Sequence, residues 1–305
     1  MEGNILTGSA SWTDKTLIAC GRFYPKEAKT AEARLRYYAS QFPMVEVDSS
    51  YYALPSASNS QLWVERTPPG FVFNVKAFRA FTGHAFDPQV LPKDMQLALG
   101  STKRSMDLED LPREMQDELW RRFIEALAPL KAAGKLGAVH FQFSPRMRDK
   151  GWVEHCVQRM EGHLLSAEFR HRSWFEGDAI EDTIAMERDL GLVHTVVDSP
   201  QGFANCVPCV WEVTNPQLAL VRLHGRNRET WNITHAKASS SRFDYWYSAD
   251  ELEAMVPEIE HLATQARQVH VVFNTNNEDQ GQVNARLMRQ LLQSGNRRRL
   301  DSRQV

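Results

Sequence analysis

Acidic and basic side chains recur where short apolar stretches of this chain end, and residues 166–174 show the pattern most clearly. If this stretch is an extended strand, Ala167 and Phe169 lie on one face while Glu168 and Arg170 lie on the other. A carboxylate and a guanidinium then share one face near the end of the strand. Parallel barrel enzymes build their active sites from polar residues in this position. The stretch therefore predicts one edge of a barrel active site.

The other strand candidates place polar side chains at the same position. Buried charges are costly unless they are paired, so these groups must be neutralised by one another, by a ligand or by a metal. In a barrel they would converge on one opening, where ligands bind. The expected inward-facing residues are Glu46, Asp48, Lys76, Gln142, Glu168, Arg170, Asp198, Arg222, His224 and Asn274.

Two interpretations of this set need no anionic ligand. In the first, the acids and bases simply pair with one another and close the top of the barrel. In the second, Glu168, Asp198 and His224 end three consecutive strands and bind a divalent cation, because carboxylates and one imidazole suit such an ion.

We favour a third interpretation, in which a small anion, such as a phosphate or carboxylate, binds to three cations of the set. Two arginines and a lysine would repel a metal ion, so a divalent metal is disfavoured, and the sequence identifies no cofactor. Carboxylates would then carry proton transfer, as in a hydrolase, lyase or isomerase. The expected cations are Lys76, Arg170 and Arg222, and the expected catalytic residues are Glu46, Glu168, Asp198 and His224. A binding module without catalysis remains a further alternative.

Further side chains are expected to line the ligand site. Gln142 and Asn274 offer amide groups at two strand ends, where they can form hydrogen bonds with a bound ligand. Aromatic residues that follow strand ends can form stacking walls. These aromatic residues are Trp12, Tyr51, Trp174 and Tyr247.

Eight strand candidates alternate with helical patterns along the 305 residues. The strands are expected at residues 4–9, 44–48, 71–76, 138–143, 166–174, 193–198, 219–224 and 270–274. Helices are expected at residues 30–42, 56–66, 109–133, 152–160, 180–190, 249–267 and 283–291. This alternation predicts the α/β class and a single (β/α)8 TIM barrel. A connection at residues 77–108, after the third strand, is unusually long and predicts a lid or an ornament.

The composition fits a soluble globular protein, with 42% hydrophobic and 24% charged residues and a formal net charge of -2. This charge gives no general attraction to nucleic acid or membranes, and the sequence contains neither a membrane-length apolar run nor a secretory signal. We therefore expect a cytoplasmic protein. The Cys206/Cys209 pair is expected to be a reduced loop pair. Residues 1–296 should form the barrel domain, and residues 297–305 a disordered basic tail.

Several motifs resemble one family, the YecE-like proteins, a domain of unknown function. They include GSASWTD from Gly8, VEVDSSYYALP from Val45, AEFRHRSWF from Ala167, VRLHGR from Val221 and FNTNNEDQGQVNA from Phe273. The resemblance spans nearly the whole chain and implies a TIM barrel with no established reaction. It implies pocket residues at Glu46, Lys76, Gln142, Glu168, Arg170, Asp198, Arg222, His224 and Asn274.

The chain departs from this family pattern in two places. Asp48 stands where the family usually has asparagine, which adds a negative charge at the expected opening. The connection at residues 78–108 also differs from the common form. The family therefore gives little guidance on lids or on substrate choice. A similarity to metal-dependent barrel nucleases such as endonuclease IV implies an alternative function, nucleic-acid binding or metal-dependent phosphodiester hydrolysis, with Glu168, Asp198 and His224 as metal ligands.

Overall fold

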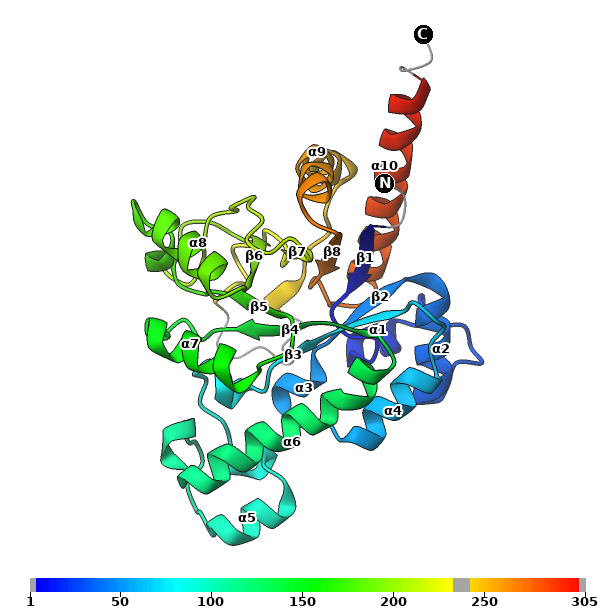
Figure 1. Cartoon of the computed structure of the whole chain (residues 1–305). Helices are drawn as coiled ribbons and strands as arrows, with labels where there is room; N and C mark the ends of the chain where they lie inside the picture. The colour runs from blue at the N-terminus through cyan, green and yellow to red at the C-terminus, as the bar shows by residue number, and fades with distance from the viewer. Residues whose placement is uncertain (1–3, 233–241, 302–305) are drawn as a thin grey trace.

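Eight parallel strands form the centre of the molecule, which is described here from a computed structural model (Figure 1). The structure describes residues 4–232 and 242–301, with side chains up to residue 294. The strands follow the order β1-β8-β7-β6-β5-β4-β3-β2, and every neighbouring pair in this order is parallel. They are β1 (Ile5–Ser9), β2 (Met44–Val47), β3 (Val72–Lys76), β4 (Leu136–Gln142), β5 (Leu165–Glu168), β6 (Val193–Asp198), β7 (Leu218–Leu223) and β8 (Gln268–Phe273).

The remaining seam lies between β1 and β2, where a parallel bridge joins Ala10 to Glu46. The amide of Ser11 also donates a hydrogen bond to the carbonyl of Glu46 over 2.9 Å. These contacts nearly close the sheet on itself. The predicted single (β/α)8 TIM barrel is confirmed.

Helices surround the strands (Figure 1). Several begin at the capping residues that the sequence offers: the Thr30 hydroxyl accepts from the amide of Ala33, and Ser248 and Glu251 form a reciprocal capping box. The helices are α1 (Lys15–Cys20), α2 (Ala31–Gln41), α3 (Ser49–Tyr52), α4 (Ala57–Glu65), α5 (Lys93–Leu99), α6 (Arg113–Ala132), α7 (Lys150–Arg159), α8 (Ala179–Asp189), α9 (Ala249–Gln265) and α10 (Gln280–Asp301).

The apolar core has two parts because strand side chains alternate between the two faces of the sheet. The larger part lies between strands and helices and contains Phe73, Val75 and Phe123. A smaller apolar cluster includes Met44, Ala138, Val193, Leu218, Leu220 and Val272. Alternation along the strands therefore separates the helix-facing core from this second cluster.

The connection from Ala77 to Pro112 contains α5 and three short 3-10 helices, η1 (Arg79–Thr82), η2 (Pro88–Val90) and η3 (Leu108–Asp110). Paired amide and carbonyl groups of Phe86 and Met106 close its base. Figure 1 shows the α5 part as a lobe beside α6, away from the strands. Most of this connection is thus an ornament on α6, and only its first residues approach the strand ends.

Helix α10 continues to Asp301, past residue 296, where we expected the ordered domain to end. The rest of the predicted tail, residues 302–305, lies outside the described residues. In the described part of the chain, no helix is both long and apolar enough to cross a membrane.

Phe81 anchors η1 to the barrel wall, because its fully buried ring stacks on Trp120 at a centroid distance of 3.7 Å. We predict that Phe81→Ala lowers the free energy of unfolding by about 3–5 kcal/mol, since the truncation leaves a cavity. Leu97→Ala on α5 is the control, because that side chain is 83% exposed and should change stability by less than about 0.5 kcal/mol. Urea denaturation measures both, and equal losses would contradict this role of Phe81.

Candidate functional site

A buried ion-pair cluster at the strand ends is centred on Arg222, at the end of β7. Its Nε donates to Oε2 of Glu46 over 3.0 Å and its Nη2 to Oε1 over 2.6 Å, and Nη1 donates to Oε2 of Glu168. All three side chains are fully buried. Burial opposes the charge on Arg222, but the two carboxylates raise its pKa. One guanidinium therefore stays charged and holds two strands through their carboxylates.

Glu168 collects further donors from neighbouring strands. Its Oε1 accepts from Nε2 of Gln142 over 2.6 Å and lies 3.3 Å from Nη1 of Arg170. Burial alone would raise the pKa of Glu168, but Arg222 and His224 hold it well below the usual value. The carboxylate therefore stays ionised at neutral pH.

His224 completes this cluster in a defined tautomer. Its Nδ1 lies 2.8 Å from the amide nitrogen of Asn274 and must accept that hydrogen, so Nε2 carries the proton and donates to Glu168 over 3.1 Å. Desolvation lowers the pKa of His224 to about 4, although Glu168 opposes the shift. The imidazole is therefore neutral at pH 7.

A second ion pair lies beside this cluster. Nζ of Lys76 is 2.8 Å from Oδ1 of Asp48, 3.2 Å from Oε1 of Gln142 and 4.6 Å from the ring centroid of Tyr51. Burial acts against both charges, yet the pKa of Lys76 is raised by Asp48 and the pKa of Asp48 is lowered by Lys76. Gln142 links this pair to Glu168.

Solvent reaches only part of these charges. The side chains of Lys76, Asp48 and Arg170 keep 8%, 16% and 11% of their surface exposed, whereas those of Glu46, Glu168 and Arg222 keep none. The guanidinium of Arg170 also lies 4.9 Å from the ring centroid of Trp231. A ligand can therefore contact Lys76, Asp48 and Arg170 directly. The three fully buried side chains can affect it only through their charge and through the residues that they position.

Two residues of the long connection join this opening, and sequence reasoning did not assign them to it. The guanidinium of Arg79 lies 5.3 Å from the Tyr51 ring centroid, and its buried Nε has no hydrogen-bond partner. Within the described part of the chain, no carboxylate forms an ion pair with Arg79. Because η1 has no sequence periodicity that fixes its side chains, only the structure places this cation at the opening.

His84 follows η1 and faces the same opening. Its ring lies 5.4 Å from that of Tyr51, and its Nδ1 is 2.9 Å from the Thr82 hydroxyl. Desolvation, together with the nearby Arg79, Lys76, Arg170 and Arg146, lowers the pKa of His84 to about 3. A positive region therefore surrounds a neutral imidazole. We call this group the mouth cluster: Asp48, Tyr51, Lys76, Arg79, His84 and Arg170.

Arg222 and Asn274, which were predicted to bind a ligand, are buried in the structure. Arg222 is fully buried and Asn274 is 4% exposed, and both use their polar groups on protein partners. The same burial removes Glu46, Glu168 and His224 from direct contact with a ligand. Strand alternation predicted their inward direction, but it gave no indication of depth.

Asp198 was expected to face the same site as Glu168, but its side chain contacts a different group of residues. It accepts from Nη2 of Arg226 over 2.8 Å and from the Tyr247 hydroxyl over 2.6 Å. With Cys209 it lines a separate cavity of about 570 Å³. Glu168 and His224 are thus in contact, but Asp198 does not join them, and among the described residues no three His, Cys, Asp or Glu side chains are arranged to hold a metal ion.

Two predicted aromatic walls lie in the core instead. Trp12 is 7% exposed and packs edge to face on Trp63 at 5.8 Å. Trp174 stacks on Phe169 at 4.1 Å, and its Nε1 donates to the carbonyl of Met147. Apolar packing explains both residues, so of the predicted aromatic residues only Tyr51 belongs to the mouth cluster.

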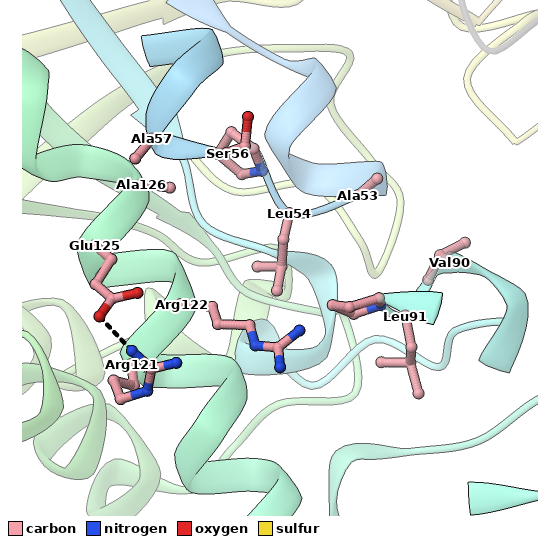
Figure 2. A pocket seen from close by; sticks show the side chains of 12 residues that line it. Ala53, Leu54, Ser56, Ala57, Val90, Leu91, Arg121, Arg122, Glu125 and Ala126 are labelled. Atoms are coloured by element: carbon pink, nitrogen blue, oxygen red, sulfur yellow. Dashed lines mark hydrogen bonds and ion pairs between the residues drawn. The ribbon is translucent and has the colours of Figure 1, made fainter. Parts of the chain in front are cut away.

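Another cavity, of about 480 Å³, lies between the α3–α4 connection and α6 (Figure 2). Leu54 and Leu91 face this space, with Arg121 and Arg122 on the α6 side. Both arginines are already paired with acids: Arg121 with Glu118 and Glu125, and Arg122 with Asp94 and Glu118. This cavity therefore offers an anion less free positive charge than the mouth cluster does.

Comparison with known proteins gives a match along nearly the whole chain. The family model described as "Protein of unknown function DUF72" matches residues 6–304. The chain is also similar to UPF0759 protein YunF of Bacillus subtilis (strain 168), with 31% identity over 294 residues and 94% of both chains covered. The resemblance drawn from the sequence motifs thus holds at the level of an uncharacterised family.

Solved structures of similar shape come from the same family. A DUF72 family protein of Enterococcus faecalis V583 has a TM-score of 0.77 and 24% identity, with 95% of both chains covered. A DUF72 family protein of Thermotoga maritima MSB8 has a TM-score of 0.73 and 23% identity, covering 95% of this chain and 99% of the other. At this identity the two structures support the fold alone.

We predict that Arg222→Met lowers the free energy of unfolding at pH 7 by about 3–5 kcal/mol, because two buried carboxylates lose their main partner. Without the guanidinium, the pKa of Glu168 should rise. The folded variant then takes up protons as the pH falls, so its deficit relative to the native protein should shrink from pH 8 to pH 5.

Denaturant titrations across this pH range measure the effect. Arg121→Met is the control, because its ion pairs are exposed and screened by solvent, so this variant should lose much less stability than Arg222→Met. A deficit for Arg222→Met that stays constant with pH would contradict the account.

Proposed function

We propose that this chain, which belongs to the DUF72 family, binds a small phosphorylated or otherwise anionic ligand at the C-terminal opening of its barrel. Lys76, Arg79 and Arg170 would contact the anion, and Tyr51 and His84 would form one wall. The observation that carries the proposal is the unpartnered, buried Nε of Arg79 beside the Tyr51 ring, at an opening where Lys76 and Arg170 also keep part of their side chains exposed.

The charge balance supports this proposal. In the buried part, Arg222 is shared by Glu46 and Glu168, which leaves one excess negative charge for Arg170 to offset. Lys76 and Asp48 balance each other. Arg79 then adds a positive charge for which the described residues supply no counterion, and an anion would neutralise it.

The geometry supports ligand binding more directly than carboxylate acid–base catalysis. Glu46 and Glu168 have no exposed surface and cannot reach a substrate without moving. Asp48 is the acid of the mouth cluster that reaches solvent, so it is the candidate for proton transfer if the ligand is turned over. In that case Lys76, which lowers the pKa of Asp48, would keep it as a base.

The metal-dependent phosphodiesterase alternative has less support, because only two of its three expected ligands, Glu168 and His224, are in contact, while the side chain of Asp198 pairs with Arg226 and Tyr247. A binding module without catalysis fits the same observations as an enzyme. Turnover of a bound ligand would distinguish these two, and neither changes the residues that hold the anion.

We predict that Arg79→Gln and Arg170→Gln each weaken sulfate binding at least about fivefold, because each removes a charge-assisted hydrogen bond. Isothermal calorimetry at low ionic strength measures the affinity. Arg121→Gln is the matched control, since its guanidinium is already paired on α6. Unchanged affinity in both mouth variants would refute the assignment.

Sulfate affinity should also stay constant within about twofold from pH 5.5 to pH 8. The pKa of His84 is about 3 and that of His224 about 4, that of Asp48 is lowered and that of Lys76 is raised, so none of these groups changes charge in this range. Calorimetry at several pH values checks this. A tenfold fall in affinity between pH 6 and pH 8 would reveal a titrating group that the account lacks.

A further inference from the structure

A cavity at the opposite end of the barrel, where the strands begin, has its own polar character. It measures about 450 Å³ and includes residues at the starts of β3, β4, β7 and β8, among them Val72, Leu136, Leu218 and Gln268. None of the described residues that line it is acidic, whereas Lys131 and Arg267 both are basic. In the described chain, neither of these two cations forms an ion pair with a carboxylate.

The floor of this cavity contains buried polar atoms without partners. His270 lines the cavity and is 1% exposed, and its Nε2 has no hydrogen-bond partner. Beside it, the amide nitrogen Nδ2 of the fully buried Asn74 also lacks a partner. Buried polar atoms are normally satisfied, so these two atoms indicate that a polar molecule belongs here.

The hydrogen bonds around Asn74 determine what His270 can offer. Oδ1 of Asn74 accepts from the amide of Ala138 over 3.0 Å, which fixes the orientation of the side-chain amide. The same oxygen lies 3.1 Å from Nδ1 of His270, so Nδ1 must carry the ring proton. Burial keeps this imidazole neutral by lowering its pKa to about 4. Nε2 is therefore a hydrogen-bond acceptor.

Gly137 allows the close packing of Asn74 and His270 at the floor. A Cβ at this position would lie 2.4 Å from Oδ1 of Asn74 and 3.2 Å from Cε1 of His270, so a larger residue would collide with both side chains. Gly137 itself lines the cavity. The absence of a side chain thus lets Asn74 and His270 pack directly against the backbone of β4.

We propose that this cavity binds a small anion that also carries a hydroxyl group, in the manner of hydrogen phosphate. Lys131 and Arg267 hold the negative oxygens at the rim, and the hydroxyl donates to Nε2 of His270. The site is separate from the mouth cluster and does not depend on the proposed function, since it uses other residues at the other end of the barrel.

Hydrogen phosphate and sulfate distinguish this chemistry, because they have similar size but only hydrogen phosphate donates a hydrogen bond at pH 7. The full chain, labelled with ¹⁵N, is titrated with each anion while the backbone amides of Gly137 and Gly162 report on this cavity. The amide of Gly83, next to His84, reports on the mouth cluster. We expect phosphate to shift the Gly137 and Gly162 signals with an affinity at least about fivefold higher than that of sulfate.

Substitutions of Lys131 and Arg267 test whether these two rim residues bind the phosphate. Lys131→Gln combined with Arg267→Gln should weaken phosphate binding at Gly137 and Gly162 at least about tenfold, because two charge-assisted contacts are lost. Both side chains are exposed, so the double variant should keep its fold. Arg170→Gln, in the mouth cluster, should leave this binding unchanged.

Three results would overturn the proposal. The first is that phosphate does not shift Gly137 and Gly162, which would mean that the buried atoms are satisfied by water alone. The second is that sulfate binds as tightly as phosphate, which would exclude the acceptor role of His270. The third is that the double variant binds phosphate as tightly as the native chain does.

Discussion

The fully buried guanidinium of Arg222, shared between the carboxylates of Glu46 and Glu168, is the interaction on which the site depends. Removing three charges from water carries a large desolvation cost, and only close pairing with good geometry offsets it. The pairing ties β7 to β2 and β5 across the inside of the barrel. It also keeps Glu168 ionised, so that Glu168 can accept hydrogens from Gln142, Arg170 and His224. The positions of these side chains therefore follow from the buried cluster beneath them.

This cluster explains why the opening favours an anion although the inward-facing residues include several acids. The two fully buried acids, Glu46 and Glu168, form ion pairs with Arg222. Asp48 forms an ion pair with Lys76. Arg79 does not belong to a strand. It lies on η1, the short 3-10 helix in which Phe81 stacks on Trp120. It brings positive charge without a matching carboxylate among the described residues. The positive charge at the opening thus depends on Arg79, from the connection after β3, as much as on residues of the barrel strands.

Sequence alternation predicted the barrel and the inward direction of Glu46, Lys76, Gln142, Glu168 and Arg222, because each lies at a fixed parity on a strand of clear apolar pattern. The sequence pattern does not indicate how deeply an inward-facing side chain is buried. It therefore could not distinguish the fully buried Arg222 from the partly exposed Arg170. Asp198 has suitable parity but turns to Arg226 and Tyr247, which lie on a connection without periodicity. Arg79 and His84 were missed for the same reason. Trp12 and Trp174 show that an aromatic residue after a strand more often fills the core.

A crystal structure of the native chain soaked in selenate would test the central claim most directly, because selenium scatters anomalously and marks the anion. The account predicts an anomalous peak within hydrogen-bond distance of Arg79 and Arg170, while Arg222 remains paired with Glu46 and Glu168. An opening without a peak, or a selenate ion bound to Arg222 after that guanidinium has left its carboxylates, would contradict it.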